Sequence, residues 1–167
     1  LYRAFYPILV ITQTIPTVAI APLLVLWFGY EMTPKIILII LVTFFPVTVG
    51  LLDGFRAVDP DAVGLLRSMG AGRWQIFRYL KCPSALPHFF SGLRIAAAYS
   101  VVGAVISEWL GGFGGLGVYM TRVKKAYAFD KMFAVIILIS VISLALMALV
   151  ELAERRCMPY RHLHEKS

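Results

Sequence analysis

The chain has 167 residues, of which 60% are apolar, and its mean hydropathy is +0.81. Because soluble domains are about 45–50% apolar, this composition excludes an ordinary soluble globular protein and favours an integral membrane protein. The formal net charge of +7 does not require a nucleic-acid partner, since lysines and arginines that flank membrane helices supply such a charge.

Three long stretches without a charged residue indicate membrane-spanning helices, at residues 4–30, 36–52 and 132–150. A helix needs about 20 mostly apolar residues to cross the hydrocarbon core. We predict helices over the following ranges: 6–30, 34–53, 87–110 and 130–154. The third is bracketed by Arg94 and Glu108, with thirteen uncharged residues between them. A bundle of buried soluble helices is the alternative, but such helices show a polar face.

The first predicted helix contains Pro16 and Pro22, which should kink or split it. The sequence has no initiator Met, and its first apolar run begins almost at residue 1. We therefore expect residues 1–167 to be a single transmembrane domain that lacks helices present at the N-terminus of a longer protein.

Lysine and arginine predict the orientation. Ten of the sixteen basic residues lie in residues 54–94 and in the C-terminal tail, which two intervening spans place on the same side of the membrane. The positive-inside rule makes that side cytoplasmic. Four basic residues between 111 and 131 oppose this bias, because they would lie outside.

The cytoplasmic connection, about 54–86, reads as two short helices joined by a glycine elbow. Asp59 followed by Pro60 is typical of a helix start, with a side-chain cap and a proline in the first turn. Gly70 and Gly72 should end that helix.

The second short helix places Trp74, Phe77 and Leu80 on one face. We expect Pro83 and Pro87 to end it before the next span. A loop lying flat on the lipid surface is the alternative interpretation.

Residues 70–77, closed by the segment 83–87, resemble the EAA loop of ABC-importer permeases that depend on a binding protein. Gly64-Leu65-Leu66 stands where that pattern has Glu-Ala-Ala. Residues 13–29 and 108–117 resemble the nitrate, sulfonate and taurine branch of the same family.

The resemblance implies an all-α polytopic bundle of the type I importer class, in the bacterial inner membrane. It implies a second permease copy, a cytoplasmic ATPase that docks on the loop, an extracytoplasmic solute-binding protein, and surrounding lipid. The chain lacks a Gly-x-x-x-x-Gly-Lys-Ser/Thr loop, so we expect no ATP hydrolysis, no catalytic or metal-binding residue and no cofactor in it. The residues expected to couple to the ATPase are Arg67, Ser68, Met69, Gly70, Ala71, Gly72, Trp74 and Phe77.

Three residues are candidates for the translocation path. Glu108 and Trp109 close the third span, and Tyr99 lies deeper in it. A carboxylate within a membrane tends to mark function, whereas one at a helix end can simply reach the headgroups. Both readings of Glu108 stay open.

The solute is less defined. Residues 115–125 most resemble permeases for pyrimidine precursors of thiamine, and sulfonate, taurine and nitrate are the alternatives. Residues 112–117 also fit Gly-x-Gly-x-x-Gly, but the strand–helix context of a dinucleotide site is missing, so we expect a flexible turn. A small membrane enzyme is a further alternative. It would require a cluster of catalytic side chains within the spans, and none is visible.

Overall fold

The computed structural model describes residues 16–158, and every regular element in that range is a helix, which confirms the predicted all-α class. The elements are α2 (Thr17–Phe28), α3 (Met32–Arg56), α4 (Pro60–Ser68), α5 (Arg73–Ile76), the π-helical turn η1 (Phe77–Lys81), α6 (Cys82–Gly111), α7 (Leu116–Lys125) and α8 (Phe129–Cys157). Three helices are long and apolar enough to cross a membrane: Met32–Arg56, the continuous helix Arg73–Gly111, and Phe129–Cys157.

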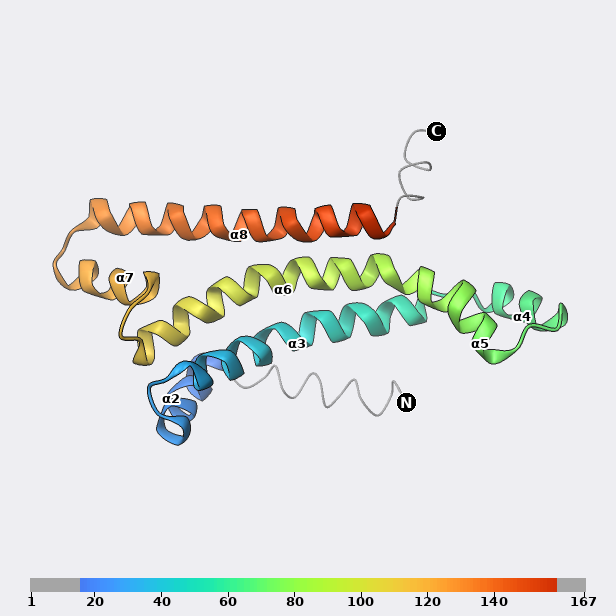
Figure 1. The fold of residues 1–167 in the computed structure, drawn as a ribbon, viewed down its shortest axis with the longest axis horizontal. Coiled ribbons are helices and arrows are strands. Elements are labelled where there is room, and N and C mark those ends of the chain that lie inside the picture. Colours follow the sequence, from blue (N-terminus) through green and yellow to red (C-terminus); the bar gives the residue numbers. More distant parts are fainter. Residues whose placement is uncertain (1–15, 159–167) are drawn as a thin grey trace.

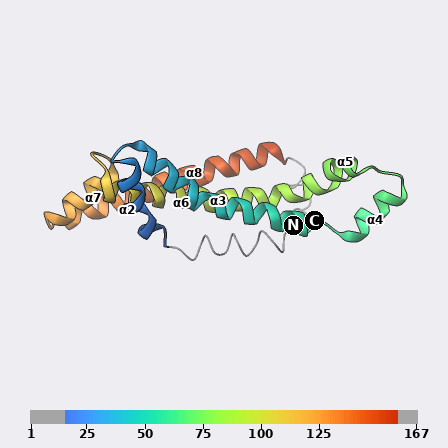
Figure 2. The same cartoon turned by 90° about the horizontal axis from the view of Figure 1, so that it is seen from below.

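The three long helices lie side by side, with α6 between α3 and α8 (Figure 1). At one end of this layer, α4 and α5 extend beyond the spans. The short helices α2 and α7 lie at the opposite end in both views (Figures 1 and 2). The connection between α3 and α6 and the C-terminal end of α8 therefore share one end, which we call the inner end.

Small residues let α3 and α6 pack backbone to backbone. A Cβ atom at Gly50 would lie 2.6 Å from the carbonyl oxygen of His88. One at Gly54 would lie 2.7 Å from the Cα of Ala85, and Gly92 lies against the carbonyl of Pro46. Glycines of this kind bring membrane helices close enough for van der Waals contact to hold them. These two helices are the most extensively packed pair in the described chain.

The first predicted helix is covered only in part, because residues 6–15 lie outside the described residues. Pro16 directly precedes α2, where a missing N–H costs nothing, and Pro22 lies inside α2. The next helix, α3, begins at Met32, close to the predicted start at residue 34.

The prediction that Pro83 and Pro87 end the second short helix is wrong. The helix runs without interruption from Arg73 to Gly111, with Pro83 in the first turn of α6 and Pro87 inside it. For Pro83 the reason is η1, where the N–H of Cys82 donates to the carbonyl of Phe77 five residues earlier. A π turn is wider than an α turn, so the ring of the following proline avoids the carbonyl with which it would otherwise clash.

Candidate functional site

The inner elbow is built by local capping chemistry. Asp59 caps α4, because its Oδ1 accepts a hydrogen bond from the N–H of Asp61 at 2.9 Å, and Pro60 opens the helix. The helix ends in a Schellman motif: Ala71 N–H donates to the carbonyl of Leu66, and Gly70 N–H donates to that of Arg67, both at 3.0 Å. Gly70 has φ +83°, a left-handed conformation that glycine adopts without penalty. The predicted elbow is therefore confirmed, and Gly70 is the residue that turns it.

Gly72 has a different role. Its φ of −71° is open to any residue, and its N–H donates to Oε1 of Gln75 at 2.7 Å, which holds the start of α5. One residue on, Ile76 is buried and anchors α5 to the bundle. Phe77 stacks on Trp74 with ring centroids 5.7 Å apart and meets Phe55 at the end of α3 at 6.0 Å.

Apolar side chains remain exposed around the elbow. Met69 is 74% exposed and Trp74 is 71% exposed, so neither side chain is buried within the described chain. A groove of about 250 Å³ opens between the two arms, lined by Leu66, Met69, Gly70, Ala71, Gln75 and Tyr79. We call the exposed set Leu65, Met69, Trp74 and Tyr79 the elbow surface.

Most of the predicted coupling residues lie on or beside this surface. Arg67 and Ser68 are exposed in the last turn of α4, where Ser68 Oγ donates to the Leu65 carbonyl at 2.8 Å. Leu65, Gln75 and Tyr79 belong to the elbow as well but were not predicted. The available signal was the apolar pair Leu65-Leu66 in a short helix that extends beyond the spans.

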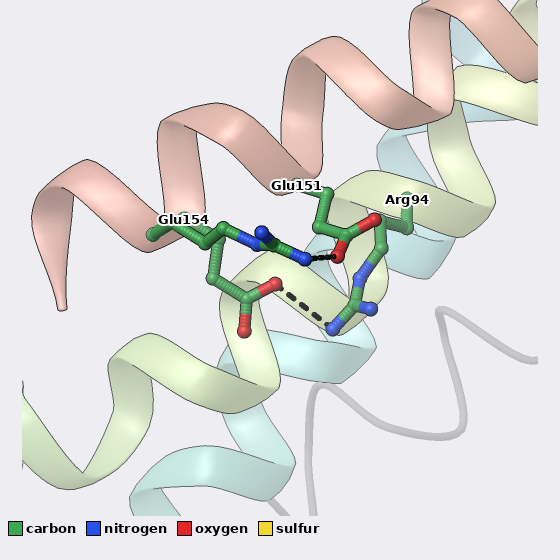
Figure 3. A network of polar contacts seen from close by, with 4 residues as sticks. Arg94, Glu151 and Glu154 are labelled. Carbon is green, nitrogen blue, oxygen red and sulfur yellow. Dashed lines mark hydrogen bonds and ion pairs between the residues drawn. The ribbon is translucent and has the colours of Figure 1, made fainter. Parts of the chain in front are cut away.

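An ion pair joins α6 to α8 near the inner end. Arg94 Nη2 lies 2.9 Å from Glu154 Oε2, and the Glu154 side chain is only 10% exposed (Figure 3). The neighbouring pair between Arg155 and Glu151, 2.7 Å apart, lies within α8 and is far more exposed. A charge placed within an apolar helix is expensive unless it is paired, and here the partner comes from the next span. Arg94 stands out in the sequence as a charge near a predicted span, but its pairing with Glu154 was not predicted.

A groove of about 570 Å³ opens between α3 and α6. Tyr99 lines it together with Phe45, while Ser91, His88 and Asp53 add polar groups toward its inner end. Among the described residues that line this groove, Asp53, His88 and Tyr99 are the ones with an ionisable group. The groove can therefore accommodate a flat, partly apolar molecule.

Glu108 and Trp109 lie at the outer end instead. The Glu108 carboxylate accepts a hydrogen bond from the N–H of Gly117 at 2.6 Å, in the first turn of α7, and fills the space that a side chain at Gly115 would need. A negative charge at a helix N-terminus is stabilising. Trp109 is half exposed beside it. The expected flexible turn at 112–117 is thus only partly right, because Gly117 is buried within α7.

Comparison with known proteins adds the following. Residues 1–158 match the family described as binding-protein-dependent transport system inner membrane components. The formylaminopyrimidine transport permease protein of Halalkalibacterium halodurans is 41% identical over 95% of this chain and 64% of its own length. The riboflavin transport system permease protein of Chloroflexus aurantiacus is 35% identical over 93% of this chain and 58% of its own length. The taurine transport system permease protein of Escherichia coli is 32% identical over 92% and 56%. The chain therefore spans about three fifths of the length of these relatives.

Proposed function

Since the chain belongs to the family of binding-protein-dependent transport system inner membrane components, we propose that it is a permease subunit of an ABC importer. In this proposal it forms a solute path across the bacterial inner membrane and couples that path to ATP hydrolysis in a separate subunit. The observation that supports it most directly is the elbow, two short helices that extend beyond the inner ends of the spans and carry exposed apolar side chains.

The ATPase would bind on the elbow surface. Large apolar side chains around a shallow groove are typical of protein interfaces, where a few of them carry most of the binding energy. The long helix Arg73–Gly111 begins at this surface, so a displacement of the elbow is passed directly into a span that lines the groove. The eight predicted coupling residues keep this role in the proposal.

Two tryptophans provide the test. Trp74 in α5 and Trp27 in α2 are 71% and 73% exposed, and these two helices lie at opposite ends of the described chain. In the full-length permease, Trp74→Ala should reduce co-purification of the ATPase and solute uptake, whereas Trp27→Ala should leave ATPase co-purification at the parent level. Equal yields of ATPase with both variants would contradict docking at the elbow.

Tyr99 would line the solute path in the groove between α3 and α6. Glu108 and Trp109, at the outer end of α6 beyond that groove, would stand at the outer mouth of the path. A sulfonate or nitrate ion would need positive charge along its path, but the described lining of the groove has no lysine or arginine and offers the Asp53 carboxyl group, the His88 imidazole and aromatic rings. These groups suit an amino-substituted heteroaromatic solute, whose ring stacks on Tyr99. One relative is a formylaminopyrimidine transport permease protein, which supports this choice of solute. Another is a taurine transport system permease protein, so taurine is the competing solute.

Uptake by the reconstituted full-length transporter distinguishes the two solutes. Labelled 4-aminopyrimidine should enter in an ATP-dependent manner, and uptake should fall with Tyr99→Ala but persist with Tyr99→Phe. Uptake of labelled taurine in place of the pyrimidine would show that the groove chemistry was misread.

We also propose that a second copy of the permease completes the path. The apolar side chains of α8, including Phe133, Ile137 and Leu144, are exposed. Such a surface requires lipid or other membrane helices around it. Cross-linking of single cysteines placed along α8 in native membranes tests whether lipid or a helix of the second copy covers each face of α8.

A further inference from the structure

The outer end of the molecule carries a cluster of positive charge that the orientation does not explain. Arg122, Lys124 and Lys125 occupy the last turn of α7 and Lys131 the first turn of α8, where Asp130 is the acidic neighbour, while Glu108 caps the opposite end of α7. The positive-inside rule disfavours cations on this side. The anionic surface that attracts such residues belongs to the cytoplasmic leaflet. All four side chains are exposed to solvent.

The link between α7 and α8 fixes two aromatic rings beside these charges. Tyr127 is 78% exposed, and Phe129 meets it edge to face with centroids 6.4 Å apart. In both views the link is the outermost part of the described chain, opposite the elbow (Figures 1 and 2). We call Arg122, Lys124, Lys125, Tyr127 and Phe129 the tip patch.

Tyr127 is held in an unfavourable backbone conformation. Its N–H donates to the carbonyl of Lys124 at 3.2 Å, and Ala128 N–H donates to that of Val123 at 3.1 Å, which is the same Schellman motif that ends α4. In α4 the left-handed position is taken by Gly70, but here Tyr127 occupies it at φ +53°, the one non-glycine residue with positive φ among the described residues. A bulky residue there costs conformational free energy that glycine would not. Strain of this kind points to a function for the side chain.

We propose that the tip patch is the docking surface for an acidic face of the solute-binding protein, which rests on the permease function proposed above. Arginine and aromatic residues are enriched at protein interfaces, and exposed positive charge speeds the encounter with a negatively charged partner. The fixed turn holds the Tyr127 ring in one orientation. A partner of defined shape uses that orientation, whereas fluid lipid headgroups do not require it.

The test uses the full-length permease with its ATPase in phosphatidylcholine nanodiscs, titrated with the purified solute-binding protein of the same transporter. Lys125→Glu should raise the binding-protein concentration that half-maximally stimulates ATP hydrolysis by about fivefold, the effect of losing one charge pair. Lys35→Glu, an equal change of charge on α3, is the control and should leave that concentration at the parent value. Raising the salt concentration should weaken the parent more than Lys125→Glu.

Tyr127→Gly separates docking from folding. The substitution relieves the strained turn, so the melting temperature should stay the same or rise, while the half-maximal concentration rises severalfold. A structural role for Tyr127 predicts the reverse, a lower melting temperature with unchanged stimulation.

The outcomes that overturn the proposal differ from those that overturn the permease function. If the binding protein stimulates the parent and all the tip variants equally, the tip patch is not the docking surface. If the variants differ from the parent only in nanodiscs that contain phosphatidylglycerol, the patch binds anionic lipid and the proposal is wrong. If no binding protein stimulates the parent complex, the proposed permease function fails and the docking surface with it.

Discussion

Replacing Gly70 should weaken ATPase docking through the backbone alone. Among the described residues, no atom lies within 4 Å of the position that a Cβ would take at Gly70, so an added side chain meets no steric obstacle there. Its φ of +83°, however, costs a residue with a Cβ about 1–2 kcal/mol. If the ATPase recognises the turned elbow, Gly70→Ala should weaken its binding by about 5- to 30-fold, which is that free energy expressed as an affinity. Gly70→Val should be worse, because a β-branched side chain restricts the turn further.

Two neighbouring glycines serve as controls. Gly72 has φ −71°, and Oε1 of Gln75 lies at an ordinary 3.6 Å from the position that a Cβ would take there, so Gly72→Ala adds no backbone strain and should weaken ATPase binding much less than Gly70→Ala. Gly64 lies inside α4 with open space around it. Gly64→Ala should stabilise that helix by about 1 kcal/mol and leave docking intact or slightly stronger.

The assay titrates purified ATPase onto the full-length permease in nanodiscs and measures uptake by the same variants in proteoliposomes. The melting temperature of the permease should not change at Gly70, because α4 and the elbow lie outside the packed spans. If Gly70→Ala and Gly72→Ala bind the ATPase equally, the left-handed turn is irrelevant to docking and the reasoning fails.

Three further predictions concern the spans. Arg94→Ala should lower stability by about 2 kcal/mol, because it removes a charged partner from a nearly buried carboxylate on α8, while Arg155→Ala in the exposed pair should cost under about 0.5 kcal/mol; equal losses in thermal unfolding would refute this. In a background without the two native cysteines, a cysteine at Gln75 should react only with reagents that reach the cytoplasm, and one at Phe113 with an impermeant reagent added outside; outside labelling at Gln75 would reverse the orientation. Glu108→Gln should keep the hydrogen bond to α7 and fold normally, so a severalfold drop in uptake at normal assembly would show that the charge acts in translocation, and parent-like uptake would leave it as a helix cap.

Local chemistry made the inner elbow predictable. The start at Asp59 and the stop at Gly70 depend on residues within one or two turns, and both appear where the sequence placed them. The charge-free stretches 36–52 and 132–150 lie in two of the long apolar helices, and the predicted helix 87–110 lies in the third, whereas the described part of the first predicted helix forms only the short α2. The family resemblance is confirmed because its motifs are contiguous in the sequence.

Contacts between distant segments could not be read in this way. Glycines at 112–117 favoured a loop, but Glu108 caps α7 from the end of α6, nine residues before its hydrogen-bond partner Gly117. The partner of Arg94 comes from a helix sixty residues further on. A proline usually ends a helix because its ring clashes with a carbonyl of the preceding turn. The π turn before Pro83 is wider and removes that clash, so the helix continues.

The unbroken helix Arg73–Gly111 gives this protein a lever. Its 39 residues extend for about 58 Å at 1.5 Å per residue, from the elbow to the outer mouth. A tilt of about 10° around the midpoint would move each end by about 5 Å, in opposite directions. The ion pair between Arg94 and Glu154 lies near the middle of this helix, where such a tilt displaces atoms least. Under the proposed coupling, α6 would tilt together with α3 while the ion pair stays closed and the two ends of the long helix move in opposite directions, so a displacement at Trp74 would reach Glu108 along one continuous helix.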